Sequence, residues 1–255
     1  MLGFILMTLL ACDDSADDTS STDDTSSTDD TSSTDDNSST DDNSSADDTS
    51  SADDTEEKPQ LHSCEGLIVF PDKNLVYALS QEPELSPGFN GTASHEELLK
   101  LTQLREASDN AEIVDLSGVE CLWNLESVHL YDNNISNIEP LRELTNLRTL
   151  DLDENSISNI EPLRELTNLR TLGLGENIYI SDISTLSGLT NLENLDLQHT
   201  DVSDISSLVA NTGIDLGDNV NLNDIALDCD DQRENLLTLL ERGVDLGNDC
   251  GSSLE

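Results

Sequence analysis

The most regular feature of the chain is a hydrophobic pattern that repeats every 22 residues. The segment ISNIEPLRELTNLRTL occupies residues 135 to 150 and recurs unchanged as residues 157 to 172. A fixed period of this length is typical of a solenoid, in which each unit buries its apolar side chains against its neighbours. Extending the register predicts units that begin at Trp123, Thr145, Thr167 and Thr190, a shortened unit around Ile214, Leu216 and Asn219, and a degenerate leading unit from about residue 101 to 122.

Each unit contains two different apolar spacings. The Leu-x-Leu pair, for example Leu150 and Leu152, has a period of two, which predicts a short strand with both leucines on its inner face. The Ile-x-x-Ile-x-x-Leu-x-x-Leu run that follows has a spacing of three, which predicts a 3₁₀-like or short helical turn. Pro140 and Pro162 fit the start of that turn because proline has no N–H to satisfy there.

The combined pattern LxxLxLxxNxIxxIxxLxxL covers roughly residues 101 to 228 and resembles that of the leucine-rich repeat family, in particular the 22-residue class of the bacterial internalins. The resemblance implies an α/β solenoid with short parallel strands on its concave face, short turns on its convex face, and helical caps. It also implies a hydrogen-bonded ladder of asparagines, which Thr200 would interrupt. The unit 167 to 189 is one residue too long, so we expect a local bulge near Tyr179.

Both ends of the solenoid need caps, because an open end would expose leucines. Residues 59 to 101 resemble the helical N-terminal cap of internalin-like proteins: Phe70-Pro71-Asp72 precedes a predicted helix, and Ser94-His95-Glu96-Glu97 is a capping-box sequence. The apolar positions of these two predicted helices are Leu75, Val76, Leu79, Leu98, Leu99 and Leu101. Residues 102 to 228 would then be the repeats.

Residues 229 to 255 form the predicted C-terminal cap, in which a helix over residues 230 to 242 ends at Gly243. Four cysteines lie in the predicted folded part, and an even number in an exported chain indicates two disulfides with three connectivities open. The helix between Cys229 and Cys250 favours a bridge across it, which leaves Cys64 to pair with Cys121 and tie the N-terminal cap to the first unit.

The N-terminal segment indicates export. Residues 1 to 11 are an apolar run, too short to span a bilayer and suited to a secretory signal. Leu9-Leu10-Ala11-Cys12 resembles the lipobox of bacterial lipoproteins, which implies lipidation of Cys12 and a membrane-anchored, extracytoplasmic lipoprotein of the outer membrane or cell surface. The alternatives are an ordinary signal peptide or an uncleaved interfacial segment.

Charge separates the chain into two parts. Of the formal net charge of −45, residues 13 to 58 account for −17 and residues 59 to 255 for −28. Within residues 12 to 58, Asp pairs recur every six residues among Ser, Thr, Asn and Ala, and this composition predicts a disordered, self-repelling spacer. A polyanion of this kind is repelled by phosphate, so the composition excludes a nucleic-acid-binding function.

The outward strand positions predict a recognition surface on the concave face. In register they are Ser127, His129, Tyr131, Thr149, Asp151, Asp153, Thr171, Gly173, Gly175, Asn194, Asp196, Gln198, Gly213, Asp215 and Gly217. We expect binding residues among these at His129, Tyr131, Asp151, Asp153, Asp196, Gln198 and Asp215. The glycines would leave a shallow notch bordered by carboxylates, which suits a basic patch on a protein or peptide. The alternative is a solvated acidic face, with the ligand bound by the loops.

Other chemistry has weaker support in the sequence. The four histidines lack metal-ligand spacing, and no nucleophile elbow or phosphate loop occurs, so we expect no cofactor, no metal and no enzymatic activity. Trp123 either covers the junction with the N-terminal cap or contacts a ligand. The leading prediction is a monomeric protein-binding module, and the alternatives are a structural or calcium-dependent surface adhesin and, less favoured, a hydrolase.

Overall fold

A computed structural model describes residues 64 to 105 and 112 to 250, all within the unit Thr55–Glu255. The predicted signal peptide, Cys12 and the acidic spacer of residues 12 to 58 lie outside the described residues. Among the described helices, none combines the length and apolarity that a membrane span requires.

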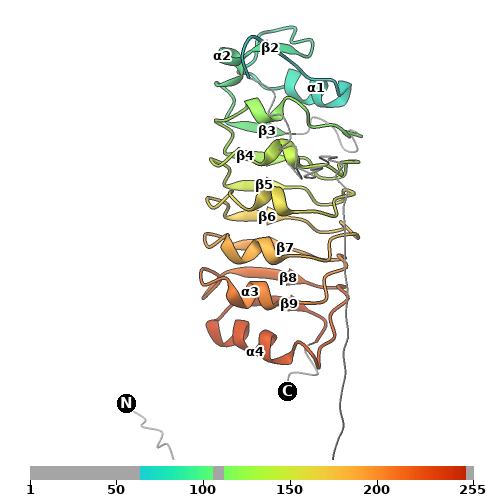
Figure 1. Cartoon of the computed structure of the whole chain (residues 1–255), viewed down its shortest axis with the longest axis vertical. Helices are drawn as coiled ribbons and strands as arrows, with labels where there is room; N and C mark the ends of the chain where they lie inside the picture. The colour runs from blue at the N-terminus through green and yellow to red at the C-terminus, as the bar shows by residue number, and fades with distance from the viewer. Residues whose placement is uncertain (1–63, 106–111, 251–255) are drawn as a thin grey trace, which may run out of the picture. The chain divides into compact units, whose positions relative to one another are not determined.

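The repeats form one parallel sheet whose seven strands follow chain order (Figure 1). Its strands are β3 (Gln103–Arg105), β4 (Ser127–His129), β5 (Thr149–Asp151), β6 (Thr171–Gly173), β7 (Asn194–Asp196), β8 (Asn219–Leu222) and β9 (Asp245–Asn248). The register is regular, with Val128, Leu150 and Leu172 opposite one another. The predicted leucine-rich repeat solenoid is therefore confirmed.

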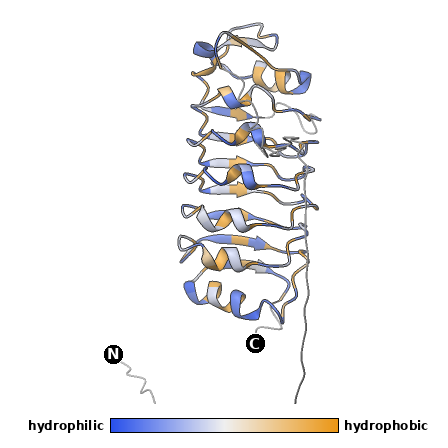
Figure 2. Cartoon of the chain, in the orientation of Figure 1, coloured by the Kyte–Doolittle hydropathy of each residue, from blue (hydrophilic) through white to orange (hydrophobic). Residues whose placement is uncertain are grey.

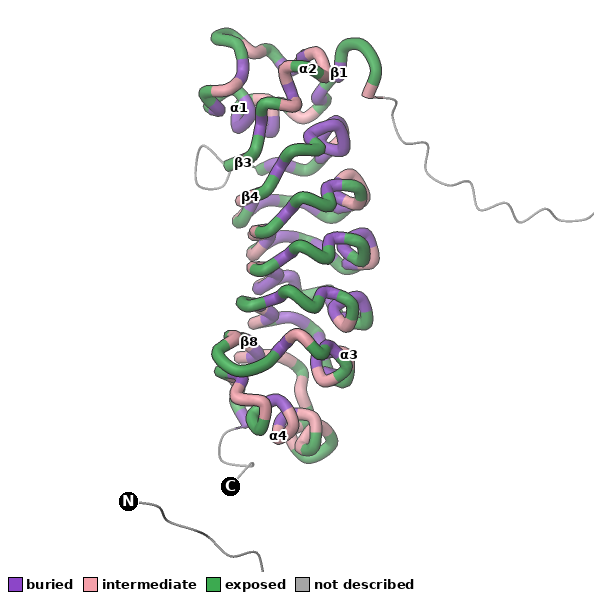
Figure 3. The backbone as a smooth tube through the Cα atoms, turned by 90° about the vertical axis from the view of Figure 1, so that its left-hand side faces the viewer, coloured by how far each residue is buried: buried purple, intermediate pink, exposed green. Residues whose placement is uncertain are grey.

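The core is a stack of identical layers. The middle residue of each strand points inward and is no more than 2% exposed at Val128, Leu150, Leu172, Leu195 and Val220. Apolar residues recur at the same place in successive turns (Figure 2), and buried stretches recur with them along the tube (Figure 3). Each layer is closed by its neighbours, as a solenoid requires.

Short turns cross the side of the solenoid opposite the sheet. They are η1 (Val119–Cys121), η2 (Glu139–Leu141), η3 (Glu161–Leu163), η4 (Ser184–Gly188) and the short helix α3 (Ser206–Ala210). Pro140 and Pro162 lie in the first turn of η2 and η3, as predicted. Proline is tolerated there because the first N–H groups of a helix have no partner within it.

In the units of β4, β5 and β6, an asparagine satisfies the backbone where the chain leaves the strand. The Asn155 Nδ2 donates to the carbonyl oxygens of Leu130, Leu152 and Asp153 at 2.9 to 3.1 Å, and its Oδ1 accepts the N–H of Ile135. Asn177 repeats this arrangement one unit later. The predicted ladder is confirmed, and it joins adjacent units because each amide bonds the unit before its own.

The ladder changes at Thr200, whose hydroxyl donates only to the Leu197 carbonyl at 2.7 Å. The same unit contains a buried amide at another position, that of Asn211, directly after α3. It is fully buried and donates to the carbonyls of Leu186 and Leu189. The sequence pattern did not identify Asn211, because it falls outside the repeated Asn position.

The N-terminal cap consists of a two-stranded sheet and two helices. Strands β1 (Leu67–Val69) and β2 (Thr92–Ser94) pair antiparallel, while α1 (Lys73–Ser80) buries Leu75 and Leu79. Asp72 caps α1, and the predicted capping box before α2 (His95–Leu98) is present. Both predicted helices are thus confirmed.

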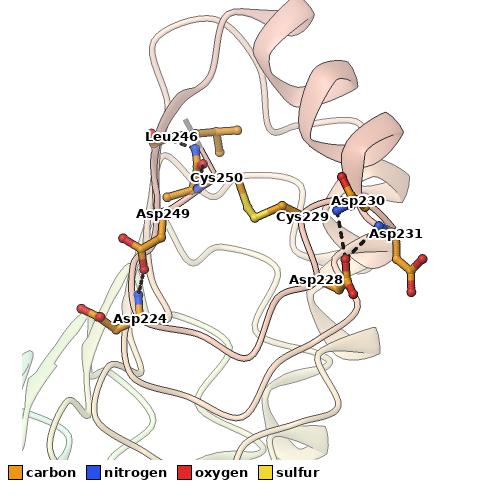
Figure 4. The surroundings of a disulfide bond; sticks show 9 residues. Asp224, Asp228, Cys229, Asp230, Asp231, Leu246, Asp249 and Cys250 are labelled. Carbon is orange, nitrogen blue, oxygen red and sulfur yellow. Dashed lines mark hydrogen bonds between the residues drawn. A yellow bond between two sulfur atoms is a disulfide. The ribbon is translucent and has the colours of Figure 1, made fainter. Parts of the chain in front are cut away.

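The C-terminal cap is the helix α4 (Arg233–Arg242), which buries Leu236 and Leu239 and ends at Gly243 with a φ of 89°. That left-handed conformation favours glycine, as predicted. Both predicted disulfides are present, Cys64–Cys121 and Cys229–Cys250. Figure 4 shows the second bridge, beside the carboxylates of Asp228 and Asp249, which accept hydrogen bonds from backbone N–H groups at 2.7 to 3.2 Å.

The predicted fifth strand is wrong. The strand is β8, and it places Val220 opposite Leu195, whereas Leu216 is 81% exposed. Residues 211 to 218 turn instead, because Gly213 packs against the backbone of Thr190, where a Cβ would overlap the Thr190 carbonyl oxygen. Val220 therefore lies three residues later than the 22-residue repeat would place the partner of Leu195, and the register does not apply to this strand.

We predict that Asn177→Ala lowers the free energy of unfolding by about 2–5 kcal/mol, because it leaves several buried backbone groups without a partner. The matched control is Asn168→Ala, since the exposed Asn168 donates a single hydrogen bond to the Thr145 carbonyl. The control should cost about 1 kcal/mol or less. Chemical denaturation measures both variants, and equal losses would contradict a structural role of the ladder.

Candidate binding surface

The outward strand residues lie in columns on the sheet, one residue from each unit. The central column contains His129, Asp151, Gly173, Asp196 and Asn221 as successive backbone partners. Neighbouring positions in such a column are about 4.8 Å apart. The structure therefore brings His129, Asp151 and Asp196 onto one face. Tyr131, Asp153 and Gln198 lie two residues after them, in the segments that continue these strands.

Asp215 is the exception, and its predicted place on this face is wrong. Its N–H donates to the Asp218 carboxylate within the turn that precedes β8. Asn219 and Asn221 occupy the face in this unit, because β8 starts later than the repeat register predicts. The sequence pattern placed Gly213, Asp215 and Gly217 on the face in this unit. Only the pairing of β7 with β8 shows that Asn219 and Asn221 lie there instead.

At one side of the face, His129 is held between two neighbours. The Ser127 hydroxyl lies 2.9 Å from its Nε2, and the Asp151 carboxylate lies 3.7 Å from its Nδ1. Arg105 is the backbone partner of His129 in β3. The basic groups of the face are thus found at its N-terminal end.

The two glycines form the floor of an acidic depression. A Cβ on Gly173 would lie 2.8 Å from Asp153 Oδ1 and 3.1 Å from Asp151 Oδ1. A Cβ on Gly175 would lie 3.2 Å from Asp196 Oδ1 and 3.4 Å from Asp153 Oδ1. The notch expected from the sequence is therefore covered by three carboxylates, which lean over the glycine backbone from both sides.

Asp153 has the most perturbed environment of the three carboxylates. Its Oδ1 accepts the N–H of Gly175 at 2.7 Å. Burial raises the pKa of Asp153 to about 7, and the charges of Asp151 and Asp196 add to the rise, whereas the Gly175 hydrogen bond opposes it. Near neutral pH the Asp153 carboxyl is therefore partly protonated.

Asp196 is positioned by hydrogen bonds rather than by a basic residue. It accepts the Gln198 N–H at 2.9 Å, and the Asn221 Nδ2 lies 3.1 Å from each of its carboxylate oxygens. Among the described arginines, Arg142, Arg148, Arg164 and Arg170 pair instead with glutamates outside this face. Asp196 is thus held in place by Gln198 and Asn221.

Trp123 lies against the N-terminal cap. Its ring packs edge-on against His95 of α2, with a centroid distance of 4.6 Å, and the residue is 45% exposed. This contact agrees with the first of the two predicted roles, that of covering the cap junction. The described residues contain no group of three or more His, Cys, Asp or Glu side chains arranged to hold a metal ion.

The fold and the columned sheet define a leucine-rich repeat solenoid. The family model described as "Leucine Rich repeats (2 copies)" matches residues 123–165, 145–188 and 167–210. These matches coincide with the units built around β4 to β7. No curated protein matches the chain at a significant level.

Solved structures of internalins have the same fold. Internalin C2 from Listeria monocytogenes is similar over 71% of this chain and 76% of its own, with a TM-score of 0.60 and 24% identity. Internalin F from the same species is similar over 71% of this chain, with a TM-score of 0.52 and 27% identity, and the match spans 57% of its length. The comparisons support an internalin-like solenoid.

We predict that Asp153→Asn stabilises the protein at pH 8 and has little effect near pH 4. Because the pKa of Asp153 is raised in the folded state, the protein loses stability as the pH rises from the unfolded pKa of an Asp, near 4, to the folded pKa of about 7. The loss is complete above that pH. Asn resembles the protonated form and can still accept the Gly175 N–H. After solvent screening the gain should be about 1 kcal/mol, or roughly 2–4 °C in Tm.

Thermal unfolding of Asp153→Asn and Asp201→Asn across this pH range provides the measurement. Asp201 is exposed, so its variant removes one charge without relieving the depression. A gain shared equally by the two variants would show that general charge repulsion, not the local environment of Asp153, sets the effect.

Proposed function

We propose that this chain is an extracytoplasmic protein-binding module, which recognises a basic group of a partner protein on its concave face. The observation that supports this most directly is the convergence of Asp151, Asp153 and Asp196 on two glycines. The internalin-like fold supports protein binding as the general role, and a binding role rather than a catalytic one.

The shape of the depression suits a cationic side chain. Gly173 and Gly175 are buried beneath Asp151, Asp153 and Asp196, whose carboxylates would surround an approaching group with acceptors. A Lys ammonium or an Arg guanidinium has several donors and a charge that would compensate the repulsion at Asp153. The partner would thus supply a positive charge beside Asp153 and Asp196, while His129 lies 3.7 Å from Asp151.

The polar neighbours extend this surface to a protein-sized contact. Gln198 and Asn221 lie beside Asp196 with amide groups that can donate or accept, and Tyr131 is 39% exposed at the other side of the depression. Aromatic residues and complementary charges are the usual determinants of affinity and association rate at protein interfaces. We propose these residues as the rim of the contact.

The N-terminal segment supports a location at the cell envelope. A lipid on Cys12 would attach the chain to a membrane, and the acidic segment of residues 12 to 58 would hold the solenoid away from it. The two predicted disulfides that the structure contains agree with an oxidising, extracytoplasmic environment. Metabolic labelling with a radioactive fatty acid would test the anchor, since Cys12→Ser should abolish incorporation.

Affinity capture with purified chain from envelope and neighbouring-cell extracts tests the face. We predict that Asp151→Asn combined with Asp196→Asn weakens the captured partner at least tenfold, because two carboxylates that orient the cation are neutralised. Surface plasmon resonance with the isolated partner measures the effect.

The repeats offer a matched control. Glu143 and Glu165 are exposed and occupy identical positions in the two identical segments, so Glu143→Gln combined with Glu165→Gln removes the same charge elsewhere. This control should bind like the wild type. Equal losses in both double variants would assign the effect to overall charge and contradict the proposed face.

Binding should also depend on pH. Because the pKa of Asp153 is raised to about 7, a cation that needs its carboxylate must displace a proton below that pH. We predict that wild-type affinity rises between pH 6 and pH 8, and that Asp153→Asn removes most of this rise. An unchanged pH profile in the variant would exclude Asp153 from the contact.

A further inference from the structure

The unit 167 to 189 uses its additional residue to expose two large apolar side chains. The Ile180 N–H donates to the Asn177 carbonyl at 3.0 Å, which closes a turn around residues 178 and 179. Ile178 is 55% and Tyr179 61% exposed. Among the exposed large apolar residues in the described part of the chain, no other two are consecutive in sequence.

The insertion has no structural role in the core. Asn177 before it and Ile180 after it are both fully buried, and Asn177 keeps every hydrogen bond that Asn155 makes. The preceding unit makes the same connection with Ser156 alone, which is exposed and polar. The fold therefore does not need either Ile178 or Tyr179, and the bulge expected from the sequence is this turn.

The surroundings of the pair are acidic. Glu154, Glu176 and His199 follow successive strands at equivalent positions, all with φ between 53° and 60°. The His199 Nε2 lies 3.5 Å from carboxylate oxygens of Glu176 and of Asp224. In the next unit, Asp201 is the exposed counterpart of Ile178.

We propose that Ile178 and Tyr179 form a second contact surface, which inserts into an apolar pocket of another protein whose rim contains Lys or Arg. A protruding Ile-Tyr pair needs a concave partner, and an acidic border selects a basic rim. A second copy of this chain would bring two strongly acidic surfaces together, and an anionic lipid surface would repel the border. This surface follows β6, the central strand, beyond the carboxyl ends of the strands, and functions independently of the concave depression.

The preceding repeat supplies the test variant. Ile178→Ser together with removal of Tyr179 converts Glu176–Ile180 into the sequence of Glu154–Ile157, which already folds in this chain. We expect its Tm to equal that of the wild type. The variant Ile178→Ser with Tyr179→Ser keeps the length of the turn and serves if the shortened unit does not fold.

The contact is identified by photo-crosslinking of the full chain in the cells that make it. p-Benzoylphenylalanine replaces Tyr179 in one sample and Ser156 in the control, and the crosslinked peptide is sequenced. We expect a crosslink from position 179 and not from 156, to an apolar protein segment with nearby Lys or Arg. The isolated partner should bind the shortened-unit variant at least tenfold more weakly, while Asp151→Asn with Asp196→Asn leaves this contact unchanged.

The other outcomes overturn the proposal. Crosslinks to lipid, to a second copy of the chain, or equally from position 156 would each assign the pair another role, and the absence of a crosslink would remove the contact. A partner whose affinity falls only in the Asp151 and Asp196 variant would support the concave face and reject the second surface. The two proposals therefore fail separately.

Discussion

The structure depends on a single constraint, which is that no 22-residue unit can bury its own leucines. Each strand is three or four residues long, and its inner side chain is covered only by the layers before and after it. The buried asparagines obey the same rule for hydrogen bonds, because the Asn155 and Asn177 amides satisfy carbonyls of the preceding unit as well as their own. Apolar burial and backbone satisfaction are therefore both shared between neighbours, and the two disulfide-bonded caps complete the layers at the ends.

Because the inner positions provide the apolar burial and the backbone hydrogen bonds, the outer strand positions are free to vary. In and directly after β5 to β7 they combine glycine with aspartate, so that the carboxylates of Asp151, Asp153 and Asp196 cover the buried backbone of Gly173 and Gly175. Burial is the main cause of the raised pKa of Asp153, and the nearby charges of Asp151 and Asp196 add to it. A partner cation placed there would reverse the sign of the interaction, which is the physical basis of the proposed binding face.

The exposed turn at Ile178 and Tyr179 is possible because residues outside the core can vary. A turn on the surface of a solenoid can accept an additional residue without disturbing the layer below it, as the full burial of Asn177 and Ile180 shows. The chain thus has two surfaces of different chemistry, one acidic and recessed, the other apolar and protruding with an acidic border. Both surfaces suit basic protein partners, in agreement with the large excess of acidic residues in the folded part.

The sequence by itself determined the period, the inner leucines, the asparagine ladder, both caps and both disulfides, because these follow from local spacing and from the need to close a stack. It could not determine the start of β8, since the close packing of Gly213 on Thr190 shifts the strand past Asp215 and brings Asn221 beside Asp196. Nor could it show that Trp123 packs on His95, or that Asp151, Asp153 and Asp196 converge over two glycines. These features depend on distances between units, and the tertiary structure alone decides them.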